Sequence, residues 1–174
     1  MSLKGKKILV LAGPEYEDLE FWVPVMRLQE EEATVLIASP KAGDTFKGKT
    51  GIPVKVEFGF EDVDLQTVDA VVIPGGWAPD KLRRYDSVKR LVKTMYDSKK
   101  IVAMICHAGL VGISAGIVKG HEATGSEGIK DDLINAGALW RDVPALRSGN
   151  LVWGRVVADI PAFCRELVLA LGNS

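Results

Sequence analysis

The chain has 174 residues, 47% of them hydrophobic, so it is long enough to bury one substantial core and too short for two. Lysine and arginine number 22 against 23 aspartates and glutamates, a balance that excludes a strong positive field for nucleic acid or an anionic membrane. No apolar run approaches the roughly 18 residues of a membrane span, and the N-terminus does not read as a secretion signal. We therefore expect a single domain over residues 1–174, with neither nucleic acid nor membrane as a partner.

The chain has two cysteines, Cys106 and Cys164, which are too few for a domain of this size to be stabilised by disulfides. A reducing, cytoplasmic compartment is expected, and it leaves both thiols free for chemistry. Two histidines and two cysteines without short spacing do not predict a zinc site. Neither a Walker loop nor a dinucleotide fingerprint is present, so we expect no metal and no cofactor.

Strand-like and helix-like segments alternate along the chain, each recognised by its hydrophobic period. Short apolar runs typical of strands cover residues 7–12, 34–38, 70–73, 101–105, 139–143, 145–147 and 151–155. The stretch 41–56, rich in glycine and lysine, predicts a hairpin. Helices are predicted after the first strand, over 87–98, from about His107, over 129–136, and after Asp159, which caps a last helix with Pro161 in its first turn.

The first predicted helix begins at Asp18 as its cap, with Pro24 in or near the first turn. Its apolar residues recur at helical spacing and form one stripe, made of Leu19, Trp22, Val23 and Met26.

This alternation predicts a mostly parallel sheet covered by helices on both faces. Ligands of such sheets bind beyond the carboxyl ends of the strands. Three chemically interesting segments are expected at that edge, namely 13–18, 74–80 and Cys106-His107.

Cys106 directly follows the apolar strand 101–105 and precedes a predicted helix, which is the strand–turn–helix context of a nucleophile elbow. A thiol at a helix N-terminus is expected to have a lowered pKa, because backbone N–H groups and the helix dipole favour the thiolate. The same N–H groups suit a developing oxyanion. The alternative is a small buried residue that only ends the strand.

Other polar groups are expected around this thiol. If His107 is catalytic, it needs a carboxylate that fixes the orientation of its ring. The alternative is a histidine in the first turn of the helix that has no catalytic role. The glycines of 74–80 either let the backbone approach a ligand or form a plain turn. The acidic cluster Glu15, Glu17, Asp18 and Glu20 either complements the helix dipole or supplies a carboxyl group that stays protonated beside the sulfur. Cys164, on the apolar stripe of the last helix, is predicted to be a packing residue.

Taken together, these motifs resemble the PfpI-type intracellular protease/amidase family, within the larger ThiJ/PfpI superfamily. The likeness spans nearly the whole chain and rests on the order and spacing of five segments: 15–18, 74–80, 103–108, 128–137 and 158–163. It implies a flavodoxin-like three-layer sandwich, similar to class I glutamine amidotransferases.

The resemblance also implies roles for individual residues. Cys106 is the nucleophile and His107 its general base or acid, and the backbone N–H groups of Gly76 and His107 form the oxyanion hole. Glu17 is the carboxylic acid that contacts the sulfur. Asp80 orients the histidine, across a subunit boundary in the family, so self-association into a dimer or hexamer is expected to complete the site.

The chain departs from the family pattern at several positions. Asp80 stands where some relatives have Glu, which shortens its reach to His107 by one methylene. Ser126-Glu127 replaces an aromatic residue and a proline, and Trp153-Gly154 replaces a pair of small hydroxyl residues. These changes alter the expected walls of the pocket.

Three functions are consistent with these residues. The first is hydrolysis of peptide or amide bonds through an acyl-cysteine. The second is glutathione-independent glyoxalase or protein deglycase chemistry, in which the thiolate adds to a 2-oxoaldehyde or its adduct. The third is a redox sensor or stress chaperone whose Cys106 is oxidised to the sulfinate. The substrate of the enzymatic alternatives is a peptide or a small molecule, and His107 favours catalysis, because a sensor needs only a thiol and an acid.

Overall fold

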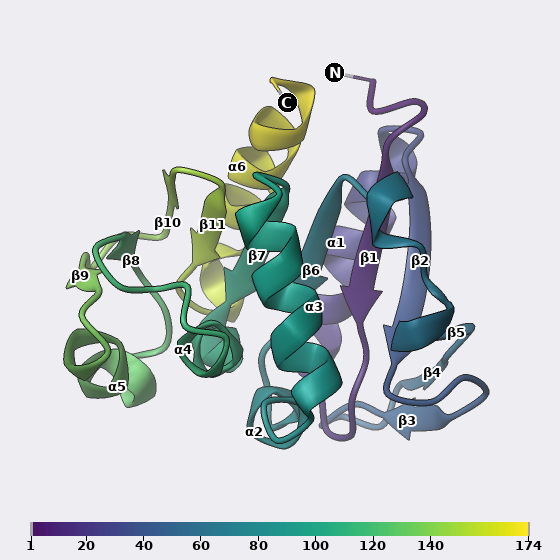
Figure 1. Ribbon diagram of the computed structural model, residues 1–174, viewed down its shortest axis with the longest axis horizontal. Coiled ribbons are helices and arrows are strands. Elements are labelled where there is room, and N and C mark those ends of the chain that lie inside the picture. Colours follow the sequence, from purple (N-terminus) through teal and green to yellow (C-terminus); the bar gives the residue numbers. More distant parts are fainter. Residues whose placement is uncertain (1, 174) are drawn as a thin grey trace.

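A computed structural model describes residues 2–173. A seven-stranded sheet forms the middle layer, in the order β10-β11-β7-β6-β1-β2-β5, and all neighbours are parallel except β10 and β11 (Figure 1). Its strands are β1 (Lys7–Leu11), β2 (Thr34–Ser39), β5 (Phe58–Gly59), β6 (Ala70–Ile73), β7 (Ile101–Ile105), β10 (Ala145–Ser148) and β11 (Leu151–Gly154). The central strands β6 and β7 are buried along their whole length, as expected for strands covered on both faces. The predicted three-layer sandwich is confirmed.

Helices cover both faces of the sheet. On one face α1 (Asp18–Glu30) packs against α6 (Ile160–Gly172), and the other face carries α2 (Ala78–Leu82), α3 (Asp86–Asp97) and α4 (Gly109–Ser114) (Figure 1). The predicted hairpin is formed by β3 (Thr45–Lys47) and β4 (Pro53–Lys55). The remaining pieces are α5 (Lys130–Asn135) and the short pair β8 (Glu122–Ala123) and β9 (Leu139–Trp140), so the strand predicted over 139–143 is only two residues long.

The register of α1 differs from the prediction. Glu17, not Asp18, is the N-cap, and Pro24 lies in the helix interior. The predicted apolar stripe faces outward, with Leu19, Val23 and Met26 exposed. The buried face instead carries Glu20, Phe21, Pro24, Val25 and Leu28. A proline in this position is tolerated on the packed face, where tertiary contacts offset the backbone hydrogen bond that it cannot make.

The α-helix after the elbow begins at Gly109, two residues later than predicted. Cys106–Ala108 forms a 3-10 turn, and α4 follows with only six residues. Its dipole is correspondingly small. At the other end of the chain, Pro161 lies in the first turn of α6 as expected. Asp159 precedes that helix, but its carboxylate binds Arg155 at 2.8 Å instead of capping the helix.

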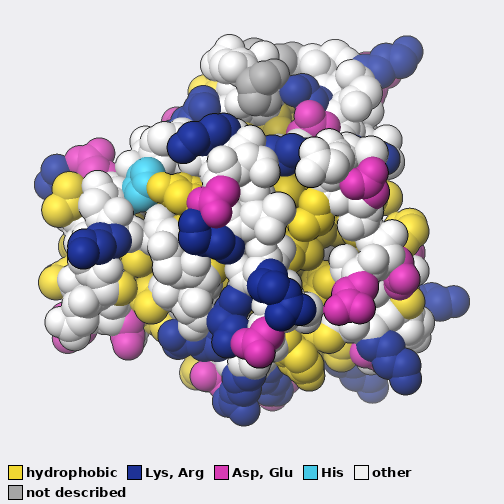
Figure 2. All heavy atoms as spheres, in the orientation of Figure 1, with side chains coloured by type: hydrophobic (Ala, Val, Ile, Leu, Met, Phe, Trp, Pro, Cys, Tyr) yellow, Lys and Arg dark blue, Asp and Glu magenta, His cyan; other side chains and the backbone are white. Residues whose placement is uncertain are grey.

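The surface agrees with the near-neutral composition. On the face covered by α3, lysines and arginines are interspersed with aspartates and glutamates (Figure 2). Among residues 2–173, none of the helices is long and apolar enough to cross a membrane.

Candidate active site

The loops after β1, β6 and β7 meet at the carboxyl edge of the sheet. The first two are joined by backbone hydrogen bonds from Trp77 N to Glu15 O (2.9 Å) and from Glu17 N to Gly75 O (3.2 Å). Gly76 has φ of +75°, and a Cβ there would lie 2.4 Å from the backbone N of Glu17, so only glycine fits. The three segments that the sequence marked as chemically interesting therefore form one site.

Cys106 occupies a strained turn directly after β7. Its φ is +61°, a left-handed conformation that costs a non-glycine residue of order 1–3 kcal/mol. The half-buried thiol interacts with two backbone N–H groups, that of Gly76 in the loop after β6 and that of His107, the next residue in the chain. A strained residue held by converging donors is typical of a nucleophile elbow.

His107 lies against its neighbour in sequence. Its Nδ1 is 3.3 Å from Cys106 Sγ, and its ring packs on Trp77 with centroids 5.8 Å apart. Burial lowers the pKa of His107, and the charge of Lys49 lowers it further. The imidazole is therefore neutral near pH 7 and competent to accept a proton.

The carboxyl group beside the sulfur belongs to Glu20, which corrects the assignment of that role to Glu17. Glu20 is fully buried, accepts a hydrogen bond from Gly75 N at 2.9 Å and lies against the Cys106 thiol. Glu17 lines the same pocket, but its carboxylate caps α1 and pairs with Lys49 at 3.6 Å. The reason is helical register: residue 20, not residue 17, shares the buried face of α1 with residues 21, 24, 25 and 28.

The expected lowering of the thiol pKa is also wrong for this chain. Burial raises the pKa of Cys106 to about 12, the negative charge of Glu20 adds to the rise, and the N–H groups of His107 and Gly76 oppose it. Burial likewise raises the pKa of Glu20 to about 7. The six-residue α4 contributes too little dipole to reverse these effects. Cys106 and Glu20 thus form a coupled pair that holds one proton over a wide pH range.

Asp80 does not contact His107 within the chain. It lies on α2, where its half-exposed carboxylate pairs with Arg84 one turn later. Among residues 2–173, the hydrogen-bond partner of the His107 imidazole is Cys106.

A pocket of about 270 Å³ opens above the sulfur. Its wall includes a residue that the sequence analysis did not single out, Lys49, from the turn between β3 and β4. Nothing in the glycine- and lysine-rich sequence of that hairpin marks one lysine over another. Among residues 2–173 no group of three or more His, Cys, Asp and Glu side chains is placed to hold a metal ion.

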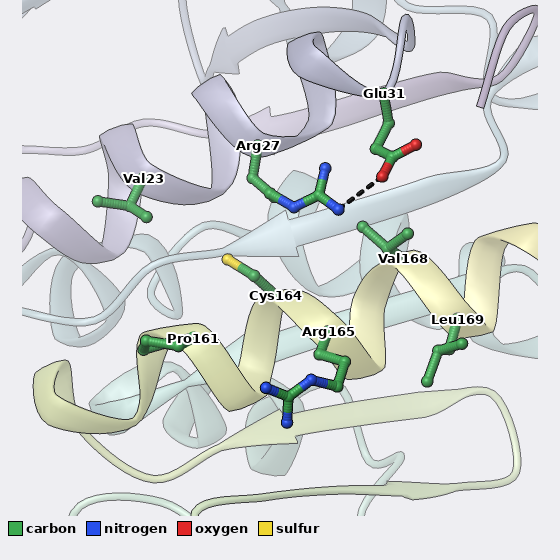
Figure 3. Close-up of a pocket in the computed structure, with 8 residues that line it drawn as sticks. All are labelled: Val23, Arg27, Glu31, Pro161, Cys164, Arg165, Val168 and Leu169. Carbon is green, nitrogen blue, oxygen red and sulfur yellow. Dashed lines mark hydrogen bonds and ion pairs between the residues drawn. The ribbon is translucent and has the colours of Figure 1, made fainter. Parts of the chain in front are cut away.

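Cys164 lies in a different groove, between α1 and α6. It is 5% exposed, and Figure 3 shows its sulfur pointing between the two helices beside Arg27, which pairs with Glu31. Burial raises its pKa to about 11. No residue that lines this groove also lines the Cys106 pocket, and the prediction that Cys164 is a packing residue is confirmed by its burial.

A parallel α/β sandwich with a strained cysteine, an adjoining imidazole and a buried carboxyl group is an arrangement suited to thiol chemistry. The family model of the DJ-1/PfpI family matches residues 6–170, and the chain belongs to that family.

Similar proteins include a deglycase of Pyrococcus horikoshii, 43% identical over 95% of this chain and 99% of the relative. A Bacillus subtilis protein provisionally named a cysteine protease is 40% identical over 93% of this chain and 96% of its own length. A crystal structure from Anabaena variabilis, in which a DJ-1/ThiJ/PfpI-like domain accompanies a ferritin-like domain, has a TM-score of 0.94. That match is 33% identical and covers 96% of this chain and 48% of the two-domain chain. The resemblance read from the motifs is confirmed, and the protein is an enzyme of PfpI type.

Proposed function

We propose that this enzyme is a deglycase, which removes the adducts of 2-oxoaldehydes from amines or thiols and releases a 2-hydroxy acid. The observation that carries the proposal is the pocket itself: about 270 Å³ above Cys106 and His107 is space for a small carbonyl compound. The name of the Pyrococcus horikoshii relative supports the same chemistry.

The reaction begins at the sulfur. The Cys106 proton passes to Glu20, which leaves His107 neutral, and the thiolate forms a bond to the aldehyde carbon of the substrate. In an adduct, the bond from this carbon to the amine or thiol breaks at the same stage, and the amine or thiol leaves with a proton. The N–H groups of Gly76 and His107, which interact with the sulfur, stabilise the oxyanion that forms beside it.

Proton transfer completes the conversion without any external oxidant. Neutral His107 takes the hydrogen from the former aldehyde carbon as a proton and returns a proton to the neighbouring carbonyl carbon. The first carbon is thereby oxidised to a thioester and the second reduced to an alcohol. Water then cleaves the thioester, giving the 2-hydroxy acid and restoring the thiol.

We propose that a second copy of the chain supplies Asp80 to His107. Asp80 is half-exposed on α2 and out of contact with the imidazole of its own chain, while a protonated His107 gains from a nearby carboxylate. Asp80→Asn is expected to lower turnover about tenfold or more, and wild-type turnover per subunit should fall when dilution dissociates the oligomer. Turnover that changes neither in Asp80→Asn nor on dilution of the wild type would contradict this role of Asp80.

The proposed function is tested by comparing products. The wild-type protein is incubated with methylglyoxal, with its adduct of N-acetylcysteine and with fluorogenic aminoacyl and peptide substrates. We expect lactate and free N-acetylcysteine without added glutathione. Release of the fluorophore with no lactate would instead establish the amidase reaction, to which the name of the Bacillus subtilis relative points. If neither lactate nor free fluorophore forms, and peroxide converts Cys106 stoichiometrically to the sulfinate, the redox sensor would be favoured.

A further inference from the structure

Lys49 is the cation of the active-site pocket. Of the described residues that line this pocket, it alone carries a fixed positive charge, because burial keeps His107 neutral. The positive charge of Lys49 lowers the pKa of both His107 and Glu20. Lysine is thus placed where a negative charge that develops on a substrate would be stabilised.

The turn that carries Lys49 is fixed from beneath by Asp18. This carboxylate is 2% exposed and accepts hydrogen bonds from Thr50 N (2.8 Å) and Ile52 N (3.0 Å). Burial opposes its charge, but these two bonds prevail and lower the pKa of Asp18. A Cβ at Gly48 would lie 2.2 Å from the same carboxylate, so glycine is required next to Lys49. The buried Asp18 carboxylate thus fixes the position of the turn, and with it the position of Lys49 in the pocket.

The backbone and the side chain of Lys49 are held as well. Its N–H donates to Tyr16 O at 2.9 Å, which ties the turn to the loop after β1. Its ammonium group lies 3.6 Å from Glu17 Oε2 and 5.9 Å from the centre of the Trp77 ring. The side chain remains 43% exposed, so a ligand entering the pocket can reach it.

We propose that Lys49 is the specificity-determining residue of the site: it binds the oxygen on the carbon next to the one that Cys106 attacks. The substrates selected in this way are small carbonyl compounds with oxygen on two adjacent carbons, such as 2-oxoaldehydes and their adducts, in preference to simple aldehydes. This inference deepens the proposed function, since the hydrogen shift between the two carbons places negative charge on that second oxygen.

The charge at this position is tested without any turnover, by alkylating Cys106 with iodoacetate and with iodoacetamide. Both reagents form the same S–C bond and release iodide, but only iodoacetate carries a negative charge on the carbon next to the attacked one. The ratio of the two rate constants, measured on the Cys106 peptide by mass spectrometry, is independent of the thiolate fraction. We expect this ratio to fall about fivefold or more in Lys49→Met.

The controls separate local charge from net charge and from structure. Lys49→Arg should keep the ratio within about twofold, and Lys47→Met, in the same hairpin but not lining the pocket, should leave it unchanged. High salt should shrink the wild-type preference for iodoacetate. Equal ratios in the wild type and Lys49→Met, with both folded as judged by thermal unfolding, would overturn the inference. A shifted ratio in a protein that forms no lactate would uphold the role of Lys49 in binding a negative charge beside the attacked carbon, and would defeat the proposed function together with the substrate class that rests on it.

Discussion

Replacing Cys106 by serine is expected to lower turnover by about 10³-fold or more while leaving stability nearly unchanged. The activity falls because a hydroxyl group is a far weaker nucleophile than a thiolate. The fold tolerates the change because the serine hydroxyl finds the partners of the thiol, with Glu20 as acceptor and the N–H groups of Gly76 and His107 as donors. Rate measurements and urea unfolding test the two halves of this expectation.

Cys164→Ser is the matched control and should behave in the opposite way. Its sulfur is buried between α1 and α6, where a hydroxyl group would lose hydrogen bonds with water. We expect the free energy of unfolding to fall by about 1–3 kcal/mol and turnover per folded molecule to persist. Full activity of Cys106→Ser would mean that Cys106 only packs the end of β7, and the enzymatic account would fail.

Much of the architecture was predictable from hydrophobic period alone. The apolar runs at 70–73 and 101–105 are strands buried on both faces, and their carboxyl ends bring Gly76 and Cys106 together as expected. The prediction succeeded because a short, continuous apolar run in an alternating α/β pattern is typical of a strand that helices cover on both faces.

The orientation of α1 was not predictable by the same means. The helix has apolar residues on two faces, and the outward stripe with Leu19 and Met26 is as regular as the buried one. A signal was nevertheless present: Glu20 is a carboxylate at helical spacing among Tyr16, Pro24 and Leu28, all of them buried. A lone acid on a packed face is costly unless it has a function, which would have favoured Glu20 over Glu17 as the partner of the sulfur.

The thiol pKa could not be inferred from the elbow motif. The motif gives the N–H groups that favour the thiolate, but the opposing effects come from burial and from Glu20, which a different element, α1, contributes. Lys49 was missed for a related reason, because its place in the pocket depends on the hydrogen bonds that Asp18 makes to a turn about thirty residues away.

The central claim, that Cys106 and Glu20 share a proton, is tested most directly by the pH dependence of Cys106 alkylation in the wild type, Glu20→Gln and Glu17→Gln. Below pH 7 both groups of the wild type are protonated. As the pH rises past about 7 one proton leaves the pair, chiefly from Glu20, and a minor form with thiolate and neutral carboxyl accompanies the main form. The second step waits until the pH approaches 12, because a thiolate beside ionised Glu20 is disfavoured.

Glu20→Gln removes that negative charge, so the variant should show a single step, above 7 and below 12, whereas Glu17→Gln should keep both steps of the wild type. Superimposable curves for the wild type and Glu20→Gln, each with one step near the ordinary thiol value of about 8.5, would contradict the shared proton and the account built on it.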